Sequence, residues 1–177
     1  MPERPPPPTE PTFTDTAQIG IVVPDLDAAV RTYRDVYGIG PWEMFEVGPE
    51  NSQDVRLYGR PVEWRGRAAV TMVGGVMWEL IQPLDDNGLF VRFLAERGGG
   101  VHHIAVVTPD FRRTLQEQIA RGNEPILSGT FSGIEVDYLN TERELGVILE
   151  VFSGMPKKKQ QQQQQQQQKK KKKKKKS

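Results

Sequence analysis

Two stretches of the chain, QIGIVVPDLDAAVRTYRDVYG at residues 18–38 and HIAVVTPDFRRTLQEQIARG at residues 103–122, align with a constant offset of 85 residues. In both, an apolar run leads into a Pro-Asp pair and then a helical pattern. A second pair, GVMWELI at residues 75–81 and GVILEVF at residues 146–152, aligns with an offset of 71. The chain therefore contains two related modules, and the first carries 14 extra residues between its ends.

Each module predicts the order strand, helix and three strands. The Asp of each Pro-Asp pair is placed to cap the free N–H groups of the helix that follows it. The first helix has an apolar face that Gly38 terminates, made of Leu26, Val30, Tyr33 and Tyr37. The predicted strands are residues 18–23, 42–48, 66–73 and 75–81 in the first module, and 103–107, 125–131, 133–139 and 145–152 in the second.

These elements indicate an α+β fold built from two βαβββ modules. We expect one domain at residues 14–153, in which residues 14–84 form the first module, residues 85–100 carry a linking helix, and residues 101–153 form the second module. A Pro-rich leader at residues 1–13 and a Lys/Gln tail at residues 154–177 are both predicted to be disordered.

Charge is divided unevenly along the chain. Residues 1–156 contain 13 Arg, no Lys and 23 acidic residues, for a net charge of −10, whereas the tail adds +11. The tail is either a polybasic arm for nucleic acid or anionic lipid, or an appendage unrelated to the domain, such as a tag or a translated A-rich transcript end. Because it holds no aromatic residues for base stacking, we favour the appendage and expect no nucleic-acid or membrane partner.

The composition also excludes several kinds of chemistry. The chain has no Cys, which removes disulfides, thiolate nucleophiles and sulfur-ligated metal sites. No apolar stretch reaches the length that crosses a bilayer, and the start, MPERPPPPTEPT, lacks the pattern of a secretion signal. We therefore expect a cytoplasmic protein.

The two histidines stand side by side in VHHIAVV, residues 101–107. Because strand side chains alternate between faces, and Ile104 and Val106 suit the helix-covered face, His103 points to the opposite face. His102 then shares the helix-covered face or lies at the strand entrance. By the repeat, Gln18 occupies the position in the first module that corresponds to His103.

The last strand of each module adds one acidic residue to that open face. Glu79 and Glu150 occupy matched positions, and both point away from the helices. Two buried carboxylates repel one another, so a shared cation is an economical explanation for them, and an amide, an imidazole and two carboxylates suit Zn, Ni, Co, Mn or Mg. The other interpretation is a set of strand-end polar residues paired with solvent or Arg. Gly20 and Ala105 are expected to leave space for a substrate.

The order of elements, together with PLDDNGLFVRFLAERGGGVHHIAVV at residues 83–107, resembles the vicinal oxygen chelate (VOC) superfamily over residues 14–153. That superfamily includes glyoxalase I, methylmalonyl-CoA epimerase, extradiol dioxygenases and antibiotic-binding resistance proteins. The resemblance implies the glyoxalase/bleomycin-resistance fold, in which two βαβββ modules form a curled mixed sheet around a metal. It also implies a homodimer.

Carried over by position, the resemblance implies that the metal ligands are Gln18, Glu79, His103 and Glu150. This combination is that of eukaryotic-type glyoxalase I, whereas the epimerase usually has His at the position of Gln18. The implied cofactor is one divalent metal ion (Zn, Ni, Co, Mn or Mg). Glu150 is expected to act as ligand and general base, and Glu79 as ligand and second acid or base.

The resemblance implies an isomerase or lyase that moves a proton at the carbon next to a carbonyl or hydroxyl group of a small molecule, as in epimerisation or glyoxalase-type detoxification. The first strand, QIGIVV, lacks the Arg that glyoxalase I uses for glutathione, so the choice between glutathione and CoA stays open. The alternatives are a binding or resistance protein without catalysis and an extradiol-type dioxygenase, whose iron favours two His ligands.

The longer excursion of the first module carries further substrate clues. Pro49-Glu50 resembles a Pro-Glu loop in which the epimerase places a catalytic acid. Four arginines fit either a bound carboxylate or phosphate or a solvated hairpin face, namely Arg56, Arg60, Arg65 and Arg67. Four aromatic residues fit either a lid or the core, namely Trp42, Phe45, Tyr58 and Trp64.

Overall fold

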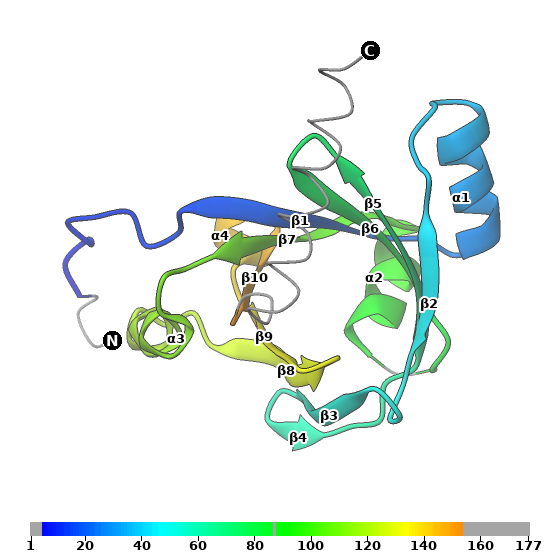
Figure 1. The fold of residues 1–177 in the computed structure, drawn as a ribbon. Coiled ribbons are helices and arrows are strands. Elements are labelled where there is room, and N and C mark those ends of the chain that lie inside the picture. Colours follow the sequence, from blue (N-terminus) through cyan, green and yellow to red (C-terminus); the bar gives the residue numbers. More distant parts are fainter. Residues whose placement is uncertain (1–4, 87, 154–177) are drawn as a thin grey trace, which may run out of the picture.

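The computed structural model describes residues 5–86 and 88–153, and within these ranges ten strands form one curled sheet (Figure 1). The strands are β1 (Asp15–Val22), β2 (Glu43–Val47), β3 (Ser52–Leu57), β4 (Arg60–Pro61), β5 (Gly66–Val73), β6 (Val76–Pro83), β7 (Gly100–Val107), β8 (Pro125–Phe131), β9 (Ile134–Leu139) and β10 (Ile148–Phe152). The helices are α1 (Leu26–Asp35), α2 (Leu89–Arg97), α3 (Phe111–Ala120) and α4 (Glu142–Leu145).

The sheet reflects the duplication. Its strand order is β2-β5-β6-β1-β7-β10-β9-β8-β3-β4. The first strands of the two modules, β1 and β7, pair antiparallel at the centre. Each is flanked in parallel by the last strand of its own module, β6 or β10. This arrangement confirms the predicted α+β fold of two βαβββ modules in a curled mixed sheet.

The extra residues of the first module extend the sheet of the second. β3 pairs antiparallel with β8, with Arg56 opposite Ser128 and Leu57 opposite Leu127. β4 continues this edge as the second strand of a short hairpin. In Figure 1 the chain runs down β2 and turns into β3 and β4 beside β8. The excursion therefore joins the two modules.

The helices pack on both faces of the sheet. On the outer, convex face, α1 covers a buried cluster that includes Leu26, Val30, Ala69 and Leu80. On the same face α3 covers a second cluster that includes Val106, Leu139 and Val151. The linking helix α2 packs instead on the inner, concave face, in a cluster that includes Val22, Phe90, Phe93, Tyr138 and Ile148. The inner face is therefore partly filled by α2, which contacts β1, β6 and β7.

The aromatic residues of the first module divide between core and surface. Trp42 packs against Tyr33 with ring centroids 5.6 Å apart, and Trp64 packs 5.8 Å from Phe131. The predicted apolar face of the first helix ends one turn early, because α1 stops at Asp35 and Tyr37 is 68% exposed.

Both predicted helix caps form. The Asp25 side chain accepts a hydrogen bond from Ala28 N at 2.9 Å, and Asp110 accepts one from Arg113 N at 3.0 Å. Replacing Asp110 with Ala is expected to lower the free energy of unfolding by about 1 kcal/mol, because an N–H group at the start of α3 loses its acceptor. Chemical denaturation measures this, with Asp110→Ser as the control that keeps a capping oxygen. Equal stability of the two variants would contradict the capping role.

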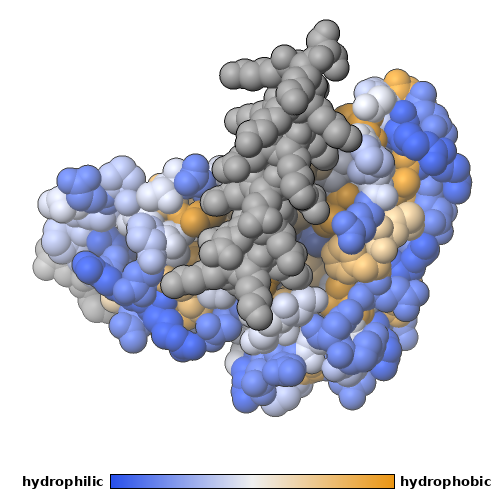
Figure 2. Space-filling view, viewed as in Figure 1, coloured by the Kyte–Doolittle hydropathy of each residue, from blue (hydrophilic) through white to orange (hydrophobic). Residues whose placement is uncertain are grey.

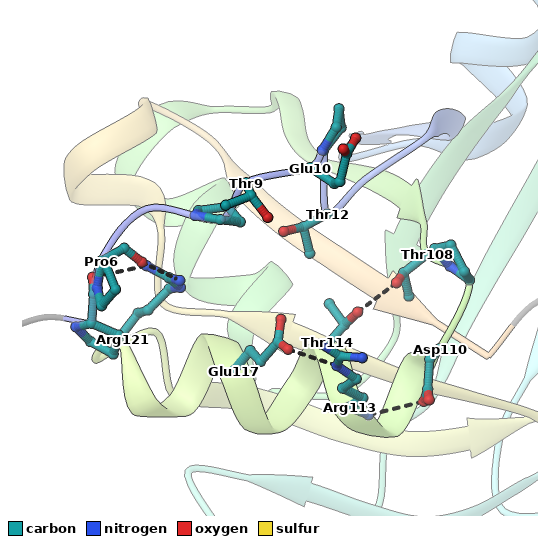
Figure 3. A pocket seen from close by; sticks show the side chains of 14 residues that line it. Pro6, Thr9, Glu10, Thr12, Thr108, Asp110, Arg113, Thr114, Glu117 and Arg121 are labelled. Atoms are coloured by element: carbon teal, nitrogen blue, oxygen red, sulfur yellow. Dashed lines mark hydrogen bonds and ion pairs between the residues drawn. The ribbon is translucent and has the colours of Figure 1, made fainter.

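The described part of the leader lies along α3 and lines a pocket of about 500 Å³ with it (Figure 3). Arg121, at the end of α3, donates hydrogen bonds to the carbonyl oxygens of Pro5 at 3.2 Å and Pro6 at 2.8 Å. Disorder of the leader stays a prediction, and the predicted disorder of the Lys/Gln tail concerns residues outside the described ranges. In the described part of the chain, no helix combines the length and apolar character needed to span a bilayer.

Candidate functional site

The four polar side chains that the sequence singled out come from the four central strands of the sheet. Gln18 lies on β1, Glu79 on β6, His103 on β7 and Glu150 on β10, and these strands are consecutive neighbours. The duplication makes the arrangement symmetric, because β1 and β7 correspond to one another and so do β6 and β10. Strand alternation then directs all four side chains to the concave face.

A glycine makes room for the imidazole. In the sheet register, Gly20 lies between Glu79 and His103, and a Cβ atom built on Gly20 would collide with the His103 ring. The space that Gly20 leaves is therefore filled by a side chain of the protein, and its prediction as substrate space is wrong. The equivalent residue of the second module, Ala105, is buried between β1 and β10.

The polar ends of the four side chains converge. Gln18 Nε2 donates a hydrogen bond of 2.5 Å to Glu79 Oε2 and lies 3.4 Å from His103 Nε2. His103 Nε2 lies 3.2 Å from Glu150 Oε2 and 3.9 Å from Glu79 Oε2. His103 Nε2 is thus within 4 Å of a polar atom of each of the other three side chains.

The site is buried and acidic. The His103 side chain is 0% exposed, that of Glu150 is 8% exposed and that of Glu79 is 16% exposed, so solvent reaches Glu79 most easily. Burial raises the pKa of Glu79 from 4.5 to about 7, the neighbouring His103 opposes this rise, and the Glu150 carboxylate adds to it. Among the described residues, Glu150 Oε2 has no hydrogen-bond partner. The negative charges of Glu79 and Glu150 are therefore only partly balanced by the neighbouring side chains.

The residues fit a divalent metal ion. Ligand atoms about 2.0–2.2 Å from one ion are themselves roughly 3–3.5 Å apart, close to the separations of 2.5–3.9 Å found here. The Gln18 amide can turn its oxygen toward the others, since its oxygen and nitrogen occupy equivalent places. Within the described residues, no three His, Cys, Asp or Glu side chains form a ready-made metal group. Binding therefore requires this amide rotation and small side-chain shifts.

Sequence reasoning did not assign a role to the second histidine. His102 is 2% exposed and its ring lies 4.8 Å from that of Phe90 and 5.0 Å from that of Phe93, both on α2. Its Nδ1 is 3.1 Å from His103 Nδ1. Burial, followed by the adjacent His103, lowers the pKa of His102 to about 3. His102 is therefore a neutral imidazole packed against the linking helix.

Tyr138 is a further residue of the site that sequence reasoning missed. It pairs with Glu150 across β9 and β10, and its ring lies 4.9 Å from that of His103. Burial raises the pKa of Tyr138 well above its usual value, and the nearby Glu150 and Glu79 charges and a hydrogen bond with Glu150 add to this rise. Strand alternation places Tyr138 on the concave face, but only the pairing with β10 brings it to Glu150.

Other candidates from the first module lie on the surface. Glu50, in the turn between β2 and β3, is exposed and pairs with Arg65 at 3.9 Å. Arg67 forms an ion pair with Asp27 at 2.9 Å. Arg56 donates to the carbonyl oxygen of the hairpin turn. These contacts match the interpretation of a solvated surface.

Metal-free protein is expected to lose stability as the pH rises from about 4.5 to about 7. Glu79 has an ordinary pKa of 4.5 and a pKa of about 7 in the folded protein, so unfolding in this window releases its proton. The stabilisation is complete below pH 4.5 and is lost as the pH passes through 7. Denaturation over this range measures the slope, which Glu79→Gln should reduce; an equal slope in both proteins would contradict the shifted pKa.

Comparison with known proteins identifies the fold family. The profile of the Glyoxalase/Bleomycin resistance protein/Dioxygenase superfamily matches residues 17–138. Among curated protein sequences, none matches the chain.

Solved structures with this fold include three that resemble the chain to a similar degree. A Streptomyces coelicolor methylmalonyl-CoA epimerase variant, in complex with 2-nitronate-propionyl-CoA, is 25% identical over 79% of this chain and 96% of its own, with a TM-score of 0.60. The Mycobacterium tuberculosis methylmalonyl-CoA epimerase is 21% identical over 82% of this chain and 91% of its own, with a TM-score of 0.58. A hypothetical protein from Bacillus halodurans is 21% identical over 81% of this chain and 96% of its own, with a TM-score of 0.60.

The family model covers nearly all of the first module and most of the second. The superfamily commonly binds divalent metals, and several of its enzymes are isomerases. The chain belongs to the glyoxalase/bleomycin resistance protein/dioxygenase superfamily.

Proposed function

We propose that the protein is a divalent-metal-dependent isomerase or epimerase that moves a proton at a carbon next to a carbonyl group. The observation that carries this proposal is the convergence of Gln18, Glu79, His103 and Glu150 on the concave face. The similarity to a methylmalonyl-CoA epimerase at 25% identity supports the reaction type.

The ion would be held by the amide oxygen of Gln18, Nε2 of His103 and the carboxylates of Glu79 and Glu150. When bound, it supplies a positive charge that stabilises the negative charge developing on a substrate carbonyl oxygen as the adjacent carbon loses its proton. All four are hard or borderline donors, which suits Zn, Ni, Co, Mn or Mg.

The two carboxylates can exchange protons with the substrate from different sides. Glu79 on β6 and Glu150 on β10 are separated by the two central strands, so a carbon held between them has one carboxylate on each side. Glu150 is the proposed base that would take the proton from one side of the carbon, and Glu79 the proposed acid that would deliver its own proton to the other side, which would invert a stereocentre. Tyr138, which is paired with Glu150 across β9 and β10, would orient the base.

The side of the first module offers an apolar approach to Glu79. Val70 pairs with Glu79, and Phe45 and Met72 share its sheet face through the register of β2, β5 and β6. Phe45 and Met72 are both exposed. Figure 2 shows hydrophobic surface in this part of the molecule. We propose that the acyl part of a thioester substrate contacts these residues, in line with the acyl-CoA ligands of the similar epimerases.

Solvent deuterium exchange tests the proposed reaction. The full chain is incubated in deuterated buffer with Zn²⁺, Ni²⁺, Co²⁺, Mn²⁺ or Mg²⁺ and a panel of branched acyl-CoA thioesters, 2-oxo acids and hydroxy-ketones. Deuterium is expected at the carbon beside the carbonyl of at least one compound, and a chelator should abolish its entry. Exchange that a chelator leaves unchanged would refute the metal-dependent reaction, and no exchange with any compound would favour a binding protein.

Two alternatives have weaker support. A ligand-binding resistance protein has no need for two acids at the same site. An extradiol-type dioxygenase favours two His and one carboxylate, and here one His stands with two acids and an amide. Oxygen uptake with a catechol and Fe²⁺ would revive the dioxygenase. The expected homodimer and cytoplasmic location remain proposals.

A further inference from the structure

We propose that His102 is a positioning residue that fixes the tautomer of His103: His102 Nδ1 accepts the Nδ1–H of His103, which leaves the Nε2 lone pair of His103 directed at Gln18, Glu79 and Glu150. The inference rests on the proposed function, because the tautomer matters only where Nε2 is a metal ligand.

The two rings are placed for one hydrogen bond. Their Nδ1 atoms are 3.1 Å apart, and both residues are buried, since His102 is 2% exposed and His103 is 0% exposed. Two Nδ1 atoms at this distance cannot both carry a proton in neutral rings, and they attract only when one donates to the other. The contact therefore couples the two tautomers.

The surroundings decide which ring donates. His103 Nε2 faces polar groups of three side chains within 4 Å, and a ligand nitrogen there must be unprotonated. Its proton then sits on Nδ1 and points to His102 Nδ1. His102 in turn carries its proton on Nε2, which has no hydrogen-bond partner among the described residues. The His102 ring as a whole packs against the rings of Phe90 and Phe93. Aromatic faces accept such N–H groups weakly.

The competing account gives His102 a packing role only. Two matched variants separate the accounts, because Asn and Leu have similar size and branch at the same atom. His102→Asn places an amide oxygen where the Nδ1 of His102 stood and so keeps an acceptor for His103. His102→Leu removes the acceptor but fills the apolar contact with Phe90 and Phe93 better. If His102 only packs, His102→Leu should be the less damaging of the two variants. If His102 positions His103, His102→Asn should bind metal more tightly than His102→Leu.

The experiment titrates Zn²⁺ into the wild-type chain and both variants by calorimetry. It also records ¹⁵N spectra of the histidine rings in the zinc-loaded protein, and the wild-type chain has only two histidines. We expect His102 in wild type to be neutral with its proton on Nε2. We expect His102→Asn to keep an affinity close to wild type and His102→Leu to lose about 10- to 100-fold, as for other partners of metal-binding histidines.

Each result bears on the inference. Equal zinc affinity of His102→Leu and His102→Asn, or a wild-type His102 with its proton on Nδ1, would overturn it while leaving the proposed function intact. If wild type binds no divalent metal, the proposed function fails and the inference fails with it. If neither variant folds, as judged by circular dichroism, the wild-type spectrum alone decides between the two tautomers.

Discussion

Replacing Glu150 with Gln is expected to lower turnover by about 10²- to 10⁴-fold while leaving the metal-free protein at least as stable as wild type. The loss follows from the removal of the proposed base, because a Gln amide has nearly the same shape but takes up no proton. It also removes one negative ligand from the ion.

The stability of this variant has a separate physical reason. Glu150 is buried, its Oε2 has no hydrogen-bond partner among the described residues, and its charge raises the pKa of Glu79. Neutralising Glu150 relieves this repulsion. A variant that merely damaged the fold would lose activity and stability together.

Deuterium exchange rates with the substrate that the panel identifies, together with urea denaturation, measure both effects. The control is Glu135→Gln on the adjoining strand β9, where Glu135 is more exposed and pairs with Arg112 at 2.7 Å. It should change activity by less than about 2-fold, as a surface pair contributes little. An activity of Glu150→Gln within about 10-fold of wild type would show that Glu150 is not the base.

Replacing Gly20 with Ala is expected to abolish high-affinity metal binding and to destabilise the fold by about 1–3 kcal/mol. The added Cβ would collide with the His103 ring, which is buried and cannot move into solvent. The control is Gly75→Ala in the turn between β5 and β6, where a Cβ meets no atom within 4 Å. Calorimetric metal titration and denaturation should separate the two variants clearly.

A double-mutant cycle tests the cause of this loss. In a His103→Ala background the collision disappears, so Gly20→Ala should cost much less stability than it does beside the imidazole. The difference between the two costs measures the Gly20–His103 contact. If Gly20→Ala lowers the free energy of unfolding equally in both backgrounds, Gly20 acts through the backbone of β1, and the His103 ring does not depend on the space beside Gly20.

The duplication explains how much of the fold the sequence could predict. Strands 18–23 and 103–107 share an alternation and a cap, so matched residues such as Gln18 and His103 had to face the same way once the modules paired. Local patterns alone determine this direction. The predicted apolar face of the first helix ran too far, because Tyr37 continues the apolar spacing beyond Asp35 but is exposed in the structure.

Contacts that depend on distant pairing could not be predicted. Nothing local in the residues of β3 shows that they pair with β8 of the other module. Tyr138 reaches Glu150 only through the β9–β10 register. Likewise, alternation predicted which face of the sheet Gly20 lies on. Only the antiparallel register of β1 and β7 shows that the His103 ring fills the space beside Gly20 on that face.

The X-ray absorption spectrum of the zinc-loaded full chain tests most directly whether these four side chains share one ion. The chain has two histidines and no cysteine, so the spectrum has few ligand types to separate. The account predicts one bound zinc with a single imidazole nitrogen and the remaining protein ligands oxygen, at about 2.0–2.2 Å. Two imidazoles, none, or a protein that retains no zinc after dialysis would contradict it.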